Sequence, residues 1–254
     1  SLTKSKRYFS AILNLLEKGE TTMLGRLPAT RGAAATRTYD AGPVSYPTTE
    51  DIQHSLMGAR LVLRRAPSIR RTLQVRVRAM DLRYPQIPLM CGHYISDPIA
   101  GAESQIDKYL VEGKLRHRER LGVYAGDIGT AALVLYYEHP KGRSPAFGKG
   151  SIIVGLGELG KLTAGRVAET VRAGVLHYLL AAADRIRQDG GTAALPDTRL
   201  MLGSMLIGYN STVNIGIENS VAAIGRGVCE ANRQVEDAVG PGLRVAALEF
   251  VEFF

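Results

Sequence analysis

The side chains best suited to chemistry gather around one predicted strand. Asp97, Glu103 and Asp107 follow the apolar segment 89–95, and Cys91 lies within it. Glu103 and Asp107 are four residues apart and would share one helix face, where carboxylates could hold a hard cation such as Mg²⁺ or stabilise the helix dipole. The dipole interpretation is favoured. No cysteine or histidine pair has zinc-type spacing, so the sequence assigns no metal ligand.

The segment Cys91-Gly92-His93 suggests a cysteine hydrolase. Residues two apart in a strand share a face but are separated by roughly 6.5 Å, whereas a nucleophile and its base must approach to about 3 Å. Cys91 is therefore interpreted as a small buried strand cysteine. A stand-alone hydrolase that uses Cys91, or the three acids named above, remains an alternative.

A glycine-rich turn, Gly155-Leu156-Gly157-Glu158-Leu159-Gly160, joins a predicted strand to a predicted helix. Its spacing matches the dinucleotide fingerprint, but the acidic residue expected about 20 positions later would fall at Leu180, inside that helix. Nicotinamide and flavin are therefore not favoured, and the sequence requires no cofactor. A loop at the carboxyl end of a strand can still cradle an anion.

Two further polar loops, 124–130 and 208–212, lie at strand ends and could line the same crevice. We therefore predict a binding site for a nucleotide-like or small anionic ligand, formed by loop residues. These residues are Gly126, Asp127, Gly129, Thr130, Gly155, Gly157, Glu158, Gly160, Tyr209 and Asn210.

The net charge of +8 lies in the N-terminal third, since residues 1–83 carry a balance of +9 and residues 84–254 a balance of −1. A dense basic segment can bind a polyanion through phosphate contacts. Between Arg60 and Arg83, the candidates are Arg64, Arg65, Arg70, Arg71, Arg76 and Arg78. No aromatic residue interrupts the cluster to stack bases, so an interface is favoured and nucleic acid binding remains an alternative.

Composition excludes several classes of protein. With 45% hydrophobic and 22% charged residues among 254, the chain is neither disordered nor fibrous. Two cysteines cannot form a disulfide framework, which indicates a reducing, cytoplasmic compartment. No apolar run approaches the roughly 20 residues of a membrane span. The chain starts without Met and ends in the apolar run 246–254, so it is interpreted as a fragment of a longer polypeptide.

Unbroken apolar strands alternate with long helices after residue 68, which predicts an α/β fold with three layers and a mostly parallel, mixed sheet. Strands are expected at 73–82, 89–95, 131–137, 151–154, 200–207 and 243–254, and helices at 101–111, 163–187 and 218–237. Residues 1–67 are expected to form a helical, loop-rich N-terminal arm, with helices at 3–18 and 47–63. The domains are thus 1–67 and 68–254.

Three stretches, 92–103, 121–130 and 154–163, carry a family resemblance. They contain Gly-His-Tyr before Asp97, Leu-Gly-Val-Tyr before Gly126, and Val-Gly-Leu-Gly-Glu-Leu-Gly before Leu162-Thr163. In this order they resemble the region that precedes the caspase-like protease domain of large bacterial CHAT-domain proteins, over roughly residues 40–254. The last stretch is also similar to the N-terminal, macrodomain-like region of leucyl aminopeptidases.

These resemblances imply a macrodomain-like domain that accompanies a peptidase. The implied function is non-catalytic: regulation, scaffolding or ligand sensing within a bacterial CHAT protein, in defence or controlled cell death. The implied partner is a caspase-like domain in the same polypeptide or another protein. No catalytic residue carries over, because neither the caspase-like His and Cys pair nor the Lys, Asp and Glu set of a dizinc aminopeptidase is recognisable.

Overall fold

The computed structural model describes residues 72–138, 146–188, 197–209 and 215–252. The helices and strands described below all lie within residues 73–254, one compact unit. The helices expected at 3–18 and 47–63, the domain boundary at residue 67, and Arg64, Arg65, Arg70 and Arg71 lie outside the described residues.

The sheet of the described residues has six strands in the order β1-β6-β5-β2-β4-β3. The strands are β1 (Gln74–Ala79), β2 (Pro88–His93), β3 (Ala131–Glu138), β4 (Ala146–Gly155), β5 (Thr198–Ser204) and β6 (Leu243–Glu252). Every pairing is parallel except that of β3 with β4, which is antiparallel. The predicted mixed, mostly parallel sheet is confirmed.

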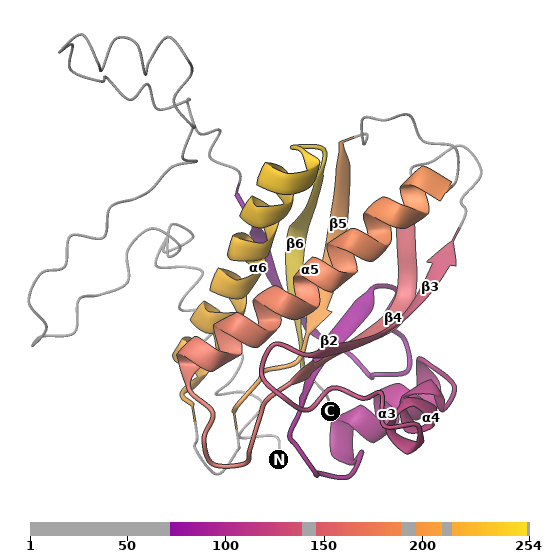
Figure 1. Cartoon of the computed structure of the whole chain (residues 1–254), viewed down its shortest axis with the longest axis vertical. Coiled ribbons are helices and arrows are strands. Elements are labelled where there is room, and N and C mark those ends of the chain that lie inside the picture. The colour runs from indigo at the N-terminus through magenta and orange to yellow at the C-terminus, as the bar shows by residue number, and fades with distance from the viewer. Residues whose placement is uncertain (1–71, 139–145, 189–196, 210–214, 253–254) are drawn as a thin grey trace, which may run out of the picture. The chain divides into compact units, whose positions relative to one another are not determined.

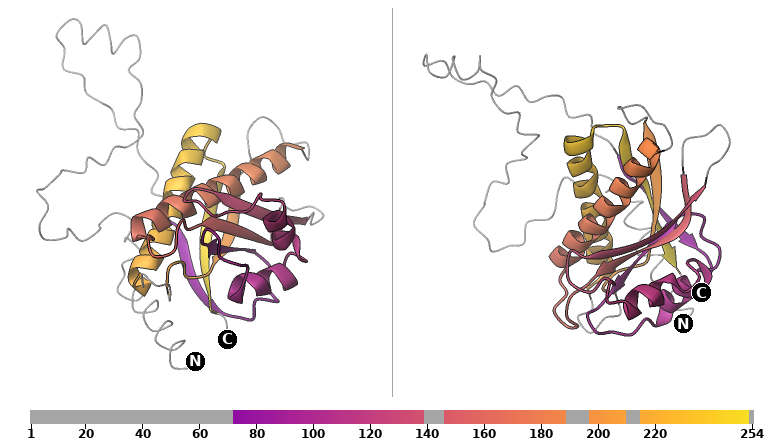
Figure 2. Two further views of the ribbon diagram at one scale, coloured as in Figure 1. Left: turned by 60° about the horizontal axis from the view of Figure 1, so that its bottom comes forward. Right: turned by 45° about the vertical axis from the view of Figure 1, so that its right-hand side comes forward.

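Helices cover the sheet on both faces (Figures 1 and 2). The long helices α5 (Ala164–Gln188) and α6 (Ile217–Val239) pack on one face, where they share an apolar core with strands β2, β4, β5 and β6. The short helices α3 (Gly101–Tyr109) and α4 (Lys114–Arg120) pack on the other face, around Leu89, Val134 and Ile153. These three layers confirm the predicted fold class.

The two long helices approach one another and the sheet closely at two glycines. A Cβ added at Gly227 would lie 2.6 Å from the carbonyl oxygen of Ala168, and one added at Gly174 would lie 2.5 Å from Val154 Cγ1. Such distances are shorter than real Cβ contacts, so any side chain there would push the layers apart. The apolar positions of α5, including Val167, Val171 and Val175, are buried as the helical spacing predicted.

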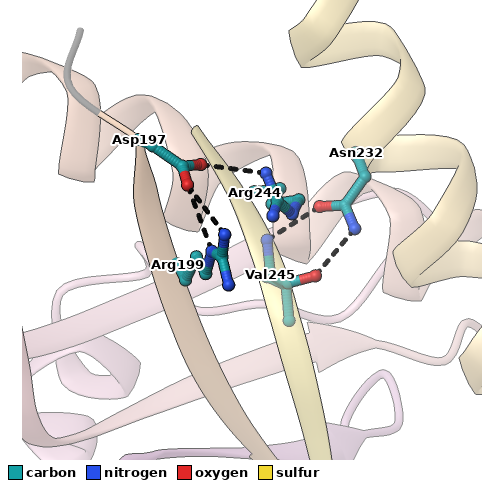
Figure 3. A network of polar contacts seen from close by, with 5 residues as sticks. All are labelled: Asp197, Arg199, Asn232, Arg244 and Val245. Carbon is teal, nitrogen blue, oxygen red and sulfur yellow. Dashed lines mark hydrogen bonds and ion pairs between the residues drawn. The ribbon is translucent and has the colours of Figure 1, made fainter. Parts of the chain in front are cut away.

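The side chain of Asn232 forms hydrogen bonds with the backbone of β6 where the register between β5 and β6 shifts. Leu200 pairs with Val245 but Met201 pairs with Ala247, so the register skips Ala246, the residue after Val245. The Asn232 amide of α6 donates to the Val245 carbonyl at 2.9 Å and accepts from the Val245 N–H at 2.9 Å (Figure 3). Beside it, Asp197 accepts hydrogen bonds from Arg199 and Arg244, so the strand ends are tied together.

The observed element bounds differ from the expected ones at a few places. Helix α4 was not expected, because its sequence KLRHRER buries only Leu115 and gives no apolar period. Strand β4 is longer than the predicted 151–154, and β1 is shorter than the predicted 73–82. Among the described residues, no helix combines the length and apolarity needed to cross a membrane.

The carboxyl ends of the parallel strands meet at one edge of the sheet. His93 ends β2 and Gly155 ends the neighbouring β4, while the antiparallel β3 begins at this edge after Thr130. The Gly155 N–H donates to the Thr130 carbonyl at 3.0 Å, and the Leu156 N–H donates to the His93 carbonyl at 2.8 Å. The three stretches of sequence that carry the family resemblance therefore lie together at this edge.

Candidate functional site

A pocket of about 470 Å³ opens at this edge of the sheet. Its walls come from the end of β2 and the loop after it, from the end of α4, and from the loop before β3. The described residues that line it are His93, Ile95, Ser96, Asp97, Pro98, Glu119, Gly122, Tyr124, Ala125, Gly126, Asp127 and Thr130. Its volume lies within the range of small-molecule sites.

A buried polar cluster of three side chains stands at the pocket wall. His93 Nδ1 lies 3.0 Å from Glu103 Oε2, and the Tyr124 hydroxyl donates to Glu103 Oε1 at 2.5 Å. The rings of His93 and Tyr124 meet edge to face, with centroids 4.8 Å apart. His93 and Glu103 are each only 7% exposed. We call these three residues the histidine cluster.

Local packing decides where each member of the histidine cluster lies. Gly92 precedes His93, and a Cβ at Gly92 would lie 2.7 Å from Leu156 Cδ1, so a larger residue there would force the Leu156 side chain of the glycine-rich turn to move. Glu103 is in the first turn of α3 but faces inward, because Ile106 on the same helix is buried against the sheet. The Glu103 carboxylate therefore contacts His93 rather than solvent.

Charge and burial act against each other on His93. Burial lowers the pKa of its imidazole, but the hydrogen bond and negative charge of Glu103, aided by Asp97 and Glu119, outweigh burial and raise the pKa above its ordinary value. Burial and the same carboxylate also raise the pKa of Tyr124, so its hydroxyl stays protonated as a donor. The cluster therefore favours the protonated form of His93 more than an isolated histidine would.

Cys91 lies beside the cluster but is not prepared as a nucleophile. Burial, helped by the negative charge of Glu103, raises the pKa of its thiol to about 12. Its neighbours belong to the apolar core under α3 and α4, and its Sγ makes only a weak contact with the Gly92 carbonyl at 3.7 Å. Since the thiolate is the reactive form, this environment favours the interpretation of Cys91 as a structural cysteine.

The glycine-rich turn and the loop before β3 bind each other through their backbones. The Gly157 N–H donates to the Gly126 carbonyl at 2.8 Å, and the Gly157 carbonyl accepts from the Ile95 N–H at 3.0 Å. From α5, the Thr170 hydroxyl donates to the Gly155 carbonyl at 2.6 Å. The amides of residues 155–157 all donate to carbonyls, so they are not free to cradle a phosphate as the glycine spacing suggested.

The predicted ligand residues divide into three groups. Gly126, Asp127 and Thr130 line the pocket, and Gly129, Gly155 and Gly157 belong to the loops that support it. Glu158 and Gly160 are exposed, and Glu158 pairs with Lys161 at 2.5 Å. Tyr209 is half-buried and is not among the described lining residues, and Asn210 lies outside the described part of the chain.

The three acids that followed the predicted strand have separate surroundings. Asp97 lines the pocket, Glu103 belongs to the histidine cluster, and Asp107 is buried where its Oδ1 accepts from the Leu115 N–H at 2.8 Å, at the start of α4. Asp107 therefore caps a helix. Within the described ranges, no group of three His, Cys, Asp or Glu side chains is arranged to hold a metal ion.

Among the pocket residues, His93 was considered from the sequence only as a base for Cys91, Tyr124 only as part of loop 124–130, and Glu119 was given no role. His93 and Tyr124 do lie in the stretches 92–103 and 121–130 that carry the family resemblance. That motif was the available signal. Their pairing through Glu103 could not be read from spacing, because it depends on how α3 packs against the end of β2.

The described arginines of the basic segment are engaged within the sheet. Arg76 donates to the Gln74 side chain at 3.1 Å, and Arg78 Nε lies 3.1 Å from Oε1 of the buried Glu249 on β6. Both arginines face outward from β1, at the edge of the sheet. Arg78 therefore forms an ion pair that links β1 to β6.

No family model and no curated protein matches this sequence. Among solved structures, one described as alphavirus P23pro-zbd is similar, with 11% sequence identity and a TM-score of 0.38. The match covers 78% of this chain and 24% of that chain. A likeness at this level gives no information on function.

Proposed function

We propose that this domain is a ligand-sensing, non-catalytic accessory domain of a bacterial CHAT protein. The observation that carries the sensing role is the pocket at the carboxyl edge of the sheet, where the loops after β2, before β3 and after β4 meet around His93. Ligands of open α/β sheets bind at this edge. The sequence resemblance supports the CHAT setting and a role in defence or controlled cell death, and the low cysteine count supports a cytoplasmic location.

Regulation would follow from the way the pocket is built. Its walls include loop 124–130, which is held to the rest of the domain by a few hydrogen bonds such as that between Gly157 and Gly126. A ligand that binds one arrangement of this loop better than another shifts the population between them. A caspase-like domain that contacts the loop, in the same polypeptide or a partner, would respond to that shift.

A pocket-filling variant tests the sensing role. A Cβ at Gly126 would lie 3.4 Å from Ile95 Cγ1, an ordinary contact, and both residues line the pocket, so Gly126→Leu fills it without a backbone clash. The chain is incubated with the small-molecule fraction of a bacterial cell extract and retained compounds are identified by mass spectrometry. We expect retention by the wild type and by the control Gly165→Leu, at an exposed position of α5, but not by Gly126→Leu.

The same variant tests regulation in the whole protein. Gly126→Leu should change the peptidase activity of the full polypeptide, whereas Gly165→Leu should not. Retention that is unchanged in Gly126→Leu, or no retained compound at all, would count against a sensing pocket. Unchanged peptidase activity would count against regulation.

The histidine cluster favours a second function, acid–base catalysis. His93 faces a pocket and is oriented by Glu103, as a general base is in many enzymes. The nearby Cys91 has a raised thiol pKa and is a poor nucleophile, which is why catalysis ranks second. A hydrolytic activity on ester or amide substrates that His93→Gln abolishes, with folding retained, would reverse this order.

A further inference from the structure

The charged residues around the pocket are of one sign, although the chain as a whole is basic. Asp97, Glu119 and Asp127 line it, and no lysine or arginine is found among the described lining residues. An electropositive chain with net charge +8 thus presents a locally acidic pocket. A cleft lined by one sign of charge concentrates ions of the opposite sign.

Two of the three hydroxyl groups of the pocket residues, those of Tyr124 and Thr130 but not that of Ser96, are already used inside the protein. The Tyr124 hydroxyl donates to Glu103, and the Thr130 hydroxyl donates to the Asp127 carbonyl at 2.6 Å. Three nearby amides are also used, since Asp97 N–H binds the Tyr94 carbonyl, Gly126 N–H binds Thr130 Oγ1 and Gly157 N–H binds the Gly126 carbonyl. The hydrogen-bonding groups that remain for a ligand are mainly acceptors. The ligand must therefore supply the hydrogen-bond donors.

His93 supplies an independent sign of a ligand. Its side chain is nine-tenths buried and lines the pocket, and its Nδ1 is held by the Glu103 carboxylate. A carboxylate only accepts, so Nδ1 carries the hydrogen; above the His93 pKa, which Glu103 raises, the ring is neutral and Nε2 is an acceptor. Nε2 has no partner among the described residues. It is the ring nitrogen left to face the pocket.

Size distinguishes an organic cation from a metal ion. The carboxylates of the described residues are too dispersed for three of them, with or without a histidine, to hold one metal ion. A volume of about 470 Å³ suits a molecule with several heavy atoms, whose donors can reach separate acceptors. The ring of Tyr124 adds an aromatic surface that also attracts cations.

We propose that the pocket binds a small organic cation bearing an ammonium or guanidinium group, recognised by Asp97, Asp127 and His93 Nε2. This inference rests on the proposed sensing function and names the chemical class of its ligand. It replaces the anionic ligand expected from the glycine spacing, because the amides of that turn and the charges of the pocket both disfavour an anion.

Isothermal titration calorimetry with four probes tests this class. Putrescine and agmatine carry the proposed groups, butane-1,4-diol is the uncharged analogue of putrescine, and ADP-ribose represents the anion. We expect binding of putrescine or agmatine, none of the diol or ADP-ribose, and loss of binding in Gly126→Leu. Asp97→Asn and Asp127→Asn should each weaken binding by about threefold to tenfold. Asp237→Asn, at an exposed position of α6, is the matched control and should not.

The possible results distinguish failure of the cation proposal from failure of the proposed sensing function. If neither cation binds but a compound from the cell extract is retained in a Gly126-dependent way, the cation inference is overturned and the sensing pocket stands. If ADP-ribose binds and Gly126→Leu abolishes this binding, the cation proposal is likewise overturned, and the sensing pocket stands. Cation binding that survives Gly126→Leu, or that Asp237→Asn weakens as much as Asp97→Asn, overturns the assignment to this pocket. If nothing is bound or retained, both proposals fall.

Discussion

His93 Nδ1 and Glu103 Oε2 lie 3.0 Å apart although the two residues belong to different layers, the strand β2 and the helix α3. Burial alone would lower the pKa of His93. The carboxylate reverses that effect, and the same carboxylate binds Tyr124 through its second oxygen. One acid therefore fixes the protonation and the orientation of a histidine at the pocket wall.

Replacing Glu103 by glutamine should lower the pKa of His93. Glu103→Gln keeps the shape and can still accept from Tyr124, but it removes the charge that opposes burial. We expect the His93 pKa, measured by NMR titration, to lie above the ordinary value of about 6.5 in the wild type and below the wild-type value in the variant. Glu119→Gln, the same change at an exposed pocket residue, should lower it less. An equal pKa in wild type and Glu103→Gln would refute the role given to Glu103.

The raised pKa of His93 also predicts how stability depends on pH. A histidine whose folded pKa is above its unfolded value stabilises the protein fully below the unfolded value, and this contribution is lost as pH rises through the folded pKa. The free energy of unfolding, measured by urea denaturation, should therefore fall as pH rises from about 6.5, the ordinary pKa of histidine, through the raised pKa of His93. The fall should be smaller in His93→Gln and unchanged in His177→Gln, whose histidine is exposed on α5. A His93→Gln curve parallel to the wild type would contradict this assignment.

The two cysteines should differ in reactivity. Burial raises the pKa of the Cys91 thiol to about 12 and that of Cys229 to about 11. One pKa unit changes the thiolate fraction about tenfold, so at about pH 8 we expect iodoacetamide to label Cys229 faster than Cys91, and the urea-unfolded chain much faster than either. Peptide mass spectrometry measures both sites. Fast labelling of Cys91 in the folded protein would instead support the hydrolase.

The fold could be predicted to a large extent because its signals are local. The turn-by-turn spacing of Val167, Val171 and Val175 predicted α5, and the unbroken run 131–137 predicted β3. Helix α4 escaped because it buries only Leu115, so its position comes from tertiary contacts such as that between Asp107 and the Leu115 N–H.

The site was harder to predict because its partners are distant in sequence. The glycines lie in loops that meet at the sheet edge, and the amides of residues 155–157 donate to carbonyls of neighbouring segments. The histidine cluster joins residues 93, 103 and 124, and only the packing of α3 against β2 brings them together. The separation of Cys91 and His93 along one strand argued against a catalytic pair. That spacing carries no information on Glu103, the partner of His93 from α3.

Gly155 links the sheet to the pocket, so enlarging it should damage both. A Cβ there would lie 2.5 Å from Thr130 Oγ1 and 2.7 Å from the Gly126 carbonyl carbon, and would also meet the Asp127 carbonyl oxygen. The neighbours are mostly backbone, which cannot move aside as a flexible side chain can. We therefore expect Gly155→Ala to lower the free energy of unfolding by about 1–3 kcal/mol and to weaken binding at the pocket.

The control for this substitution is Gly165→Ala in the first turn of α5. Its Cβ would have only Thr163 Oγ1 within 4 Å, at 3.8 Å, so the change fits. Alanine also restricts the unfolded chain more than glycine does, so Gly165→Ala should leave stability unchanged or raise it by up to about 1 kcal/mol. Urea denaturation followed by circular dichroism compares the two variants. If Gly155→Ala is as stable as Gly165→Ala, loop 126–130 is not held against the end of β4, and the pocket lacks the wall that both proposed binding roles require.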